Sequence, residues 1–150
     1  MNSQKTPFRV LLTDDDEDDR LIFKEILNEI DKDINVSMVI DGKQLMDFLT
    51  NENNPLPHII FLDLNMPNMN GIECLNEIRN HEKYSDISIA IYSTSSSKED
   101  IDDTFSHGAN IYITKPATYS ELKVVLKKSL SAAHLNRNSD FVKSNFVLKL

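Results

Sequence analysis

The stretch HIIFLD, residues 58–63, places four consecutive large apolar residues before an aspartate, Asp63. A second run of the same kind, VLL at residues 10–12, leads through Thr13 into Asp14 and Asp15. Strands with one wet face alternate apolar and polar residues, whereas strands that are buried on both faces are continuously apolar. The two runs therefore predict two central strands of a parallel sheet, each followed by carboxylates.

Further runs of strand length extend this pattern along the chain. Those rich in β-branched residues lie at residues 8–13, 35–40, 58–63, 88–93 and 110–114. Apolar residues with helical spacing follow each run, and glycines such as Gly42, Gly71 and Gly108 mark boundaries between segments. Five strand-then-helix units imply a parallel sheet with helices on both faces. We expect a doubly wound α/β fold with five helices and the strand order 2-1-3-4-5.

The composition is that of one globular domain. The 150 residues are 40% hydrophobic and 27% charged, and the longest apolar run is too short to cross a bilayer. The first residues lack a secretory signal pattern, and the single cysteine, Cys74, has no internal partner. We therefore expect a cytoplasmic protein without membrane association. The net charge of −8 would repel a phosphate backbone and argues against nucleic-acid binding.

The chain divides near the end of its last predicted helix. We expect residues 1–134 to form the domain and residues 135–150 to form a C-terminal extension without a separate effector domain. The end of this extension, FVKSNFVLKL at residues 141–150, is apolar for a terminus. It could lie back on the domain, add a strand to a sheet edge or bind a second copy in a homodimer. We favour packing on the chain itself or on a dimer mate.

The carboxyl ends of the strands are where a doubly wound sheet places its site, between strands 1 and 3. Acids, hydroxyls and one ammonium are expected to meet there: Asp14, Asp15, Asp16, Asp63, Ser93, Thr94 and Lys115. Clustered carboxylates repel one another, and a hard cation such as Mg2+ (or Mn2+) relieves that repulsion. An ammonium and a hydroxyl suit phosphoryl oxygens. This edge therefore predicts metal-assisted phosphoryl transfer to a carboxylate.

Four runs at this edge resemble those of two-component response regulator receiver domains. They are LLTDD (11–15), DLNMPNMNG (63–71), YST (92–94) and TKP (114–116). The resemblance covers residues 7 to 130, and the chain looks most like stand-alone chemotaxis-type members, some of which serve phytochrome or hybrid sensor kinases. It implies a flavodoxin-like fold, and a protein that takes a phosphoryl group from a histidine kinase or a phosphotransfer protein and signals by protein contact.

The same resemblance implies roles for the acidic residues. Asp63 would be the phospho-acceptor. The metal would be bound by Asp15 directly, by Asp14 through water, by Asp63, and by the backbone carbonyl of Asn65.

Phosphoryl binding and switching are implied for residues at the ends of the fourth and fifth strands. Ser93 and Lys115, with Thr94 beside them, would bind the phosphoryl oxygens, and the Lys115–Pro116 peptide would be cis. Ser93 would move toward the phosphoryl group while Tyr112 turns inward, so that the face of helix 4, strand 5 and helix 5 repacks. Tyr112 could equally be an ordinary core residue.

Two neutral residues, Asn65 and Ser95, occupy the positions from which a general base would activate water for dephosphorylation. We therefore expect the chain to catalyse its own phosphorylation and a slow dephosphorylation, and no turnover chemistry as an enzyme. The alternative is a phosphorylation-independent protein-binding module on the same fold.

Three further acids near the first strand have simpler interpretations. Asp16 is expected to cap the first helix rather than bind metal. Asp18 and Asp19 are interpreted as solvated residues in its first turn, where negative charge favours the helix dipole.

Overall fold

A computed structural model describes residues 7–66, 69–135 and 146–148 of the chain. The strands are β1 (Arg9–Thr13), β2 (Asn35–Val39), β3 (Ile59–Leu62), β4 (Ser88–Ser93) and β5 (Ile111–Thr114). The helices are α1 (Glu17–Ile30), α2 (Gly42–Thr50), α3 (Gly71–Arg79), α4 (Lys98–Ser106) and α5 (Tyr119–Leu135), with a short 3-10 helix, η1 (Glu82–Tyr84), before β4.

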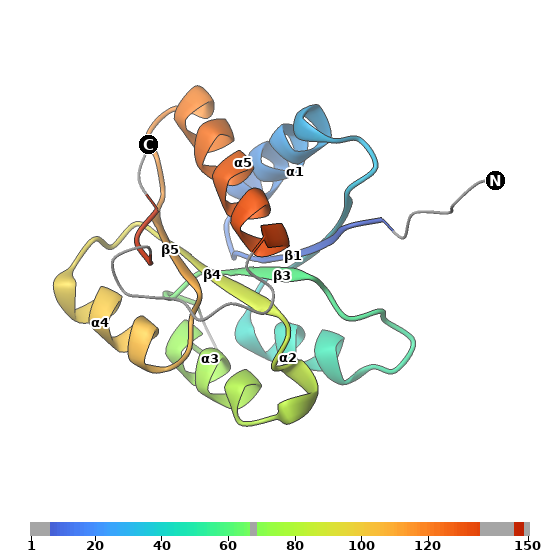
Figure 1. Ribbon diagram of the computed structural model, residues 1–150, viewed down its shortest axis with the longest axis vertical. Coiled ribbons are helices and arrows are strands. Elements are labelled where there is room, and N and C mark those ends of the chain that lie inside the picture. Colours follow the sequence, from blue (N-terminus) through green and yellow to red (C-terminus); the bar gives the residue numbers. More distant parts are fainter. Residues whose placement is uncertain (1–6, 67–68, 136–145, 149–150) are drawn as a thin grey trace.

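The strands form one parallel sheet in the order β2-β1-β3-β4-β5. Helices α1 and α5 cover one face, and α2, α3 and α4 cover the other (Figure 1). The predicted doubly wound fold, its strand order and its five helices are confirmed. The observed strand bounds differ from the expected ones by at most one residue at either end, as is usual where a strand passes into a loop.

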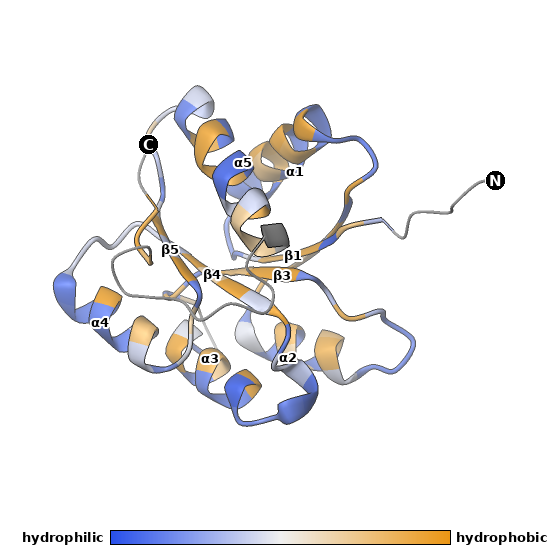
Figure 2. Cartoon of the chain, in the orientation of Figure 1, coloured by the Kyte–Doolittle hydropathy of each residue, from blue (hydrophilic) through white to orange (hydrophobic). Residues whose placement is uncertain are grey.

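Two hydrophobic cores, one on each face, hold the helices on the sheet. Alternate residues of the central strands face opposite layers. Leu11, Ile60, Leu62, Ile89 and Ile91 pack toward α2 and α3, whereas Val10, Leu12, Ile59, Phe61 and Ala90 pack toward α1 and α5. All four residues of β3 are buried, which explains why its sequence shows no alternation. Figure 2 shows apolar residues on the strands and on the inward sides of the helices.

Side-chain caps set where several helices begin. Asp16 accepts a hydrogen bond from the N–H of Asp19 at 3.0 Å, so its expected role as the cap of α1 is confirmed. Asp41, Asn70 and Ser97 cap α2, α3 and α4 in the same way. These caps fix the helix starts, which all lie at the carboxyl edge of the sheet.

The outer side of β5 is covered by the C-terminal residues Phe146–Leu148. Val147 forms a parallel bridge with Tyr112, and Phe146 is fully buried. Strand addition to a sheet edge was one of the expected arrangements, and the structure places this segment against its own domain (Figure 1). The other residues of the predicted apolar tail, 141–145 and 149–150, lie outside the described part of the chain. None of the described helices is both long enough and apolar enough to span a membrane.

Candidate phosphoryl and metal site

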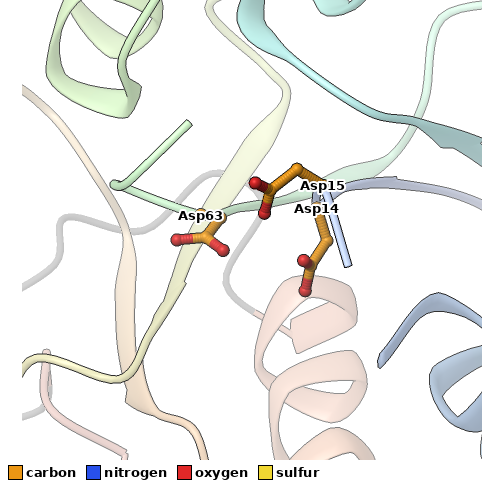
Figure 3. A group of neighbouring side chains, drawn as sticks. All are labelled: Asp14, Asp15 and Asp63. Carbon is orange, nitrogen blue, oxygen red and sulfur yellow. The ribbon is translucent and has the colours of Figure 1, made fainter. Parts of the chain in front are cut away.

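The ends of β1 and β3 bring three aspartates together. Asp14 and Asp15 follow β1 and Asp63 follows β3, and one carboxylate oxygen of each lies within 4.8 Å of the others. In Figure 3 their side chains extend from adjacent strand ends into one region. Asp14 is fully buried and Asp63 nearly so, whereas Asp15 is exposed. The predicted acidic cluster therefore exists, and it is open to solvent on the side of Asp15.

Backbone N–H groups hold the two buried carboxylates. Asp16 N–H donates to Asp14 Oδ1 and Asn65 N–H donates to Asp63 Oδ1, each at 3.0 Å. Each turn fixes one oxygen of the carboxylate and leaves Oδ2 for other partners. The start of helix α3 packs tightly against the turn at Asp63. A Cβ on Gly71, the first residue of α3, would lie only 2.6 Å from the carbonyl oxygen of Asp63, so there is no room for a side chain there. The acidic half of the site is thus fixed by the backbone.

Lys115, directly after β5, supplies the positive charge of the site. Its Nζ lies 2.9 Å from Asp14 Oδ2 and 3.1 Å from Asp63 Oδ2. A third carboxylate oxygen, Asp19 Oδ2 on α1, lies 3.2 Å away. An ammonium has three hydrogens, so each carboxylate can take one. The backbone N–H of Lys115 also donates to the carbonyl of Ser93 at 2.7 Å, which ties the end of β5 to the end of β4.

The charges at this site do not balance. Burial raises the pKa of Asp63, although the Asn65 N–H and the Lys115 ammonium act in the opposite direction. Burial alone would lower the pKa of Lys115, but hydrogen bonds and charge from Asp14 and Asp63 outweigh it and raise that pKa above its ordinary value. One ammonium thus faces several carboxylates. The excess negative charge and the oxygen-only donor set fit a hard divalent cation.

Asp19 and Arg20 belong to the site, although the sequence did not identify them. Asp19 lies in the first turn of α1, as expected, and its side chain is 40% exposed, but its carboxylate also pairs with Lys115, so the interpretation as a merely solvated residue is incomplete. Arg20 Nη1 donates to the backbone carbonyl of Asp14 at 2.8 Å. The sequence held only part of the signal, since it shows which residues share a helix face but not how that face lies against β5. Phe23 is buried, and residues four apart share a helix face, so Asp19 lies on the inward side of α1.

The hydroxyl groups of Ser93 on β4 and Tyr112 on β5 are linked through Ser95, in the loop after β4. Ser93 is fully buried, and its Oγ accepts the N–H of Ser95 at 3.1 Å. The phenol of Tyr112 donates to the carbonyl of Ser95 at 2.8 Å. Ser95 Oγ in turn donates to Asp100 Oδ2 on α4 at 2.5 Å. Thr94, which was also expected to bind phosphoryl oxygens, is exposed.

The peptide bond before Pro116 differs from the expectation. None of the peptide bonds in the described residues is cis, so the cis Lys115–Pro116 bond implied by the family resemblance is wrong for this structure. Proline narrows the energy gap between the isomers, but trans is still favoured by about 0.5–1 kcal/mol. The trans bond nevertheless leaves the ammonium of Lys115 in contact with Asp63.

A surface cavity of about 200 Å³ opens beside the ammonium, between α1 and the start of α5. Asp19, Tyr92 and Lys115 line its polar end. Ile22 and Tyr119, each 40% exposed, line its apolar part. The charged site therefore continues into an amphipathic surface that a partner could contact.

Known proteins with the same fold and sequence pattern are numerous. Response regulator Rcp1 of Synechocystis is 31% identical over 127 residues, which cover 81% of this chain and 86% of that one. A chemotaxis protein CheY homolog of Campylobacter jejuni is 33% identical over 122 residues, covering 81% and 92%.

Solved structures agree with these relatives. The phosphorylated cyanobacterial phytochrome response regulator RcpA matches with a TM-score of 0.80 and 29% identity, over 87% of this chain and 96% of that one. The Mn2+-bound form of Rcp1 matches with a TM-score of 0.71 and 27% identity, over 91% and 99%. The family model for the response regulator receiver domain matches residues 10–127. The chain therefore belongs to the response regulator receiver domain family.

Proposed function

We propose that this receiver domain is a phospho-acceptor switch, which takes a phosphoryl group onto Asp63 with the help of Mg2+ or Mn2+. Receiver domains of this type work with histidine kinases, and the proposed donor is a phosphohistidine of such a kinase or of a phosphotransfer protein. The observation that carries the proposal is the ammonium of Lys115, which contacts Oδ2 of both Asp14 and Asp63 in an otherwise acidic cluster.

The metal would be held by the carboxylates of Asp14, Asp15 and Asp63 and by the backbone carbonyl of Asn65. The fit rests on charge and ligand type, since several carboxylates share one ammonium and hard cations prefer oxygen ligands. Asp15 is the exposed member of the cluster, so its carboxylate is hydrated and can replace that water with a metal ion that enters from solvent. When bound, the cation would neutralise charge on the phosphoryl oxygens.

Asp63 is the best acceptor because of its place in the sheet. Strand β3 lies between β1 and β4, so Asp63 has the acids of β1 on one side and Ser93 on the other. In the transfer, a carboxylate oxygen of Asp63 forms a bond to phosphorus as the phosphorus–nitrogen bond of the donor breaks. The imidazole leaves with the electron pair of that bond, and the reaction mainly requires alignment and charge neutralisation.

The hydroxyl of Ser93 and the ammonium of Lys115 would bind the transferred phosphoryl oxygens. Lys115 can do so with little movement, because its Nζ is already 3.1 Å from Asp63 Oδ2. Thr94 would contribute only if it turned from its exposed position. We also assign Tyr112 to the switch, since its phenol donates to the loop that carries Ser95.

Dephosphorylation should be slow. Asn65 is exposed and uncharged, and Ser95 already donates its hydroxyl hydrogen to Asp100. Neither is a good general base for an attacking water. The domain would then catalyse its own phosphorylation and a slow hydrolysis, with no turnover of an external substrate.

The kinase or phosphotransfer partner is proposed to contact the amphipathic surface beside Lys115. Ile22 on α1 and Tyr119 on α5 are partly exposed apolar residues within reach of the ammonium. A partner that packs on them could bring its phosphohistidine to the open side of Asp63. Exposed apolar residues that gather around a charged site are typical of such interfaces.

The test is mass spectrometry of the full chain after incubation with acetyl phosphate and Mg2+. We expect an adduct of about 80 Da, the mass of one phosphoryl group, in the wild type. Asp63→Asn should abolish it, whereas Asp86→Asn, a change at an exposed aspartate before β4, should leave it intact. If neither acetyl phosphate nor a phosphorylated kinase labels the wild type, a phosphorylation-independent binding module is the better description.

A further inference from the structure

The C-terminal residues Phe146–Leu148 act as an additional short strand on the outer side of β5. The N–H of Tyr112 donates to the carbonyl of Phe146 at 2.9 Å, and the N–H of Leu148 donates to the carbonyl of Tyr112 at 2.9 Å. An uncovered edge strand would present these backbone groups to solvent or to another chain. The segment therefore occupies the groups through which β5 could bind an extended partner.

One aromatic side chain anchors this segment. Phe146 is fully buried, and its ring packs edge-on against Phe105 of α4, with 5.2 Å between centroids. It also packs against the ring of Tyr112, at 6.0 Å between centroids. The anchor thus fills the groove between α4 and β5, on the face that also carries the switch residues.

Tyr112 connects this anchor to the phosphoryl site. Its ring contacts Phe146, its phenol donates to the carbonyl of Ser95 at 2.8 Å, and the N–H of Ser95 donates to Ser93 Oγ at 3.1 Å. Burial raises the pKa of Tyr112, while its hydrogen bonds with Ser95 and Ser93 act in the opposite direction. Ser95 therefore links the Ser93 hydroxyl at the end of β4 to the phenol of Tyr112.

The hydroxyl of Ser93 has only one hydrogen to donate. A phosphoryl group on Asp63 would offer charged oxygens, and hydrogen bonds to charged acceptors are stronger than those to neutral ones. Drawing the hydroxyl toward the phosphoryl group weakens its hydrogen bond with the N–H of Ser95. Because the carbonyl of Ser95 holds the phenol of Tyr112, this loosens the ring on which Phe146 packs. Coupling between two sites is reciprocal, so docking of the segment must oppose phosphoryl binding by the same factor.

We propose that Phe146–Leu148 is an intramolecular ligand of β5, and that phosphoryl binding at Asp63 weakens its docking through Ser93, Ser95 and Tyr112. The coupling rests on the proposed function, because it requires phosphoryl binding at Asp63. The docking of the segment does not depend on that function. While the segment is bound, it excludes any partner that adds a strand to β5. Residues 135–150 are then a regulatory extension of the domain.

The main experiment follows amide hydrogen exchange by NMR in the full chain, with Mg2+ alone and with Mg2+ plus beryllofluoride, a mimic of the phosphoryl group. The Leu148 amide should be protected with Mg2+ alone, and its exchange should accelerate at least threefold with the mimic. Unchanged exchange while fluorine NMR shows the mimic bound would overturn the coupling. If the wild type binds no mimic, the proposed function and the coupling both fail, and protection at Leu148 still reports on docking.

Two variants separate docking from coupling. Phe146→Ala should remove the protection of the Leu148 amide even without the mimic. It should also lower the dissociation constant of the mimic, by the same factor by which the mimic weakens docking of the segment in the wild type. The control is Val124→Ala, which removes two methyl groups from a residue of α5 that is 43% exposed. It should change neither the protection of the Leu148 amide nor the affinity for the mimic. Tyr112→Phe keeps the ring and removes the phenol. It should retain protection at Leu148 but lose the acceleration by the mimic, and a full wild-type response would contradict the route through Ser95.

The origin of the docked segment is tested by dilution. A segment from the same chain gives protection at Leu148 that does not change over a hundredfold range of protein concentration. Protection that falls on dilution, together with a sedimentation coefficient that falls from dimer to monomer, would mean that the segment comes from a second copy. That result would overturn the intramolecular assignment.

Discussion

At the ends of β1 and β3, each buried carboxylate takes a hydrogen bond from a backbone N–H two residues further along the chain. At the ends of β4 and β5, the Ser93 hydroxyl also takes a backbone N–H, that of Ser95, but the phenol of Tyr112 reaches this loop only through its side chain, by donating to the carbonyl of Ser95. Backbone turns hold a group in one position, whereas a hydroxyl or a phenol can exchange partners by rotating about one or two bonds. The first half of the site is therefore built to fix reacting groups, and the second half to respond to them.

Lys115 joins the two halves, and its removal should have the largest effect. In Lys115→Met the phosphoryl group loses a charged donor, and removing one such donor typically slows a reaction by about 10²–10³-fold. We expect a loss of that size in the rate of labelling by acetyl phosphate. Because the carboxylates lose their counter-ion, added Mg2+ should also raise the melting temperature of the variant more than that of the wild type.

The control for this change is Lys123→Met on α5, whose ammonium lies 3.4 Å from a carboxylate oxygen of Glu29 at the surface. It should leave the labelling rate and the effect of Mg2+ on the melting temperature close to the wild-type values. A labelling rate of Lys115→Met within threefold of the wild type would show that the two halves do not depend on this ammonium.

The fixed half should be sensitive to packing beneath it. Gly71→Ala places a methyl group 2.6 Å from the carbonyl oxygen of Asp63 and 2.7 Å from the Cα of Leu64. Because both neighbours are backbone atoms, the loop after β3 must shift, and overpacking of this kind costs about 1–3 kcal/mol. We expect that loss in urea unfolding, with slower phosphorylation. The control is Asn76→Ala, at an exposed position of the same helix, which should be as stable as the wild type and be labelled at the same rate.

The pH dependence of stability tests whether burial or pairing dominates at Asp63. Burial raises its pKa from the ordinary value of 3.8, so the folded protein favours the neutral carboxyl group. The penalty for its charge is therefore present at neutral pH, and it disappears as the pH falls from the raised pKa toward 3.8. Without metal, Asp63→Asn should unfold at higher urea concentration than the wild type at pH 7, and this advantage should shrink across that interval.

The measurement is the urea midpoint of unfolding of Asp63→Asn and of the wild type, taken at each pH in the presence of a metal chelator. Asp86→Asn removes an exposed carboxylate and should show no such change with pH. If Asp63→Asn is less stable than the wild type at neutral pH, the ion pair with Lys115 outweighs burial, and the fixed half is held by charge rather than by its backbone turns.

The fold and the fixed half of the site could be predicted because their signals are local. The continuous apolar run at residues 59–62 identifies a doubly buried strand, and the residue after such a strand lies at the functional edge. The contact of Asp19 with Lys115 was missed because it depends on how α1 rotates against β5. The tail showed a tendency to pack, but nothing local to Phe146 indicates a groove between α4 and β5, which only the folded domain creates.

Asp19 provides the smallest test, because it belongs to neither half. Its side chain is 40% exposed, and exposed ion pairs contribute about 0–1 kcal/mol, so Asp19→Asn should change stability by less than about 1 kcal/mol. Removing this carboxylate frees one hydrogen of Lys115 for a phosphoryl oxygen. Labelling by acetyl phosphate should then become about two- to fivefold faster, which is the effect of up to about 1 kcal/mol on a barrier. Asp18→Asn, at an exposed position of the same helical turn, should leave the rate unchanged. A tenfold slower rate in Asp19→Asn would instead mean that Lys115 needs this third carboxylate to stay in place, and that the fixed half of the site extends onto α1.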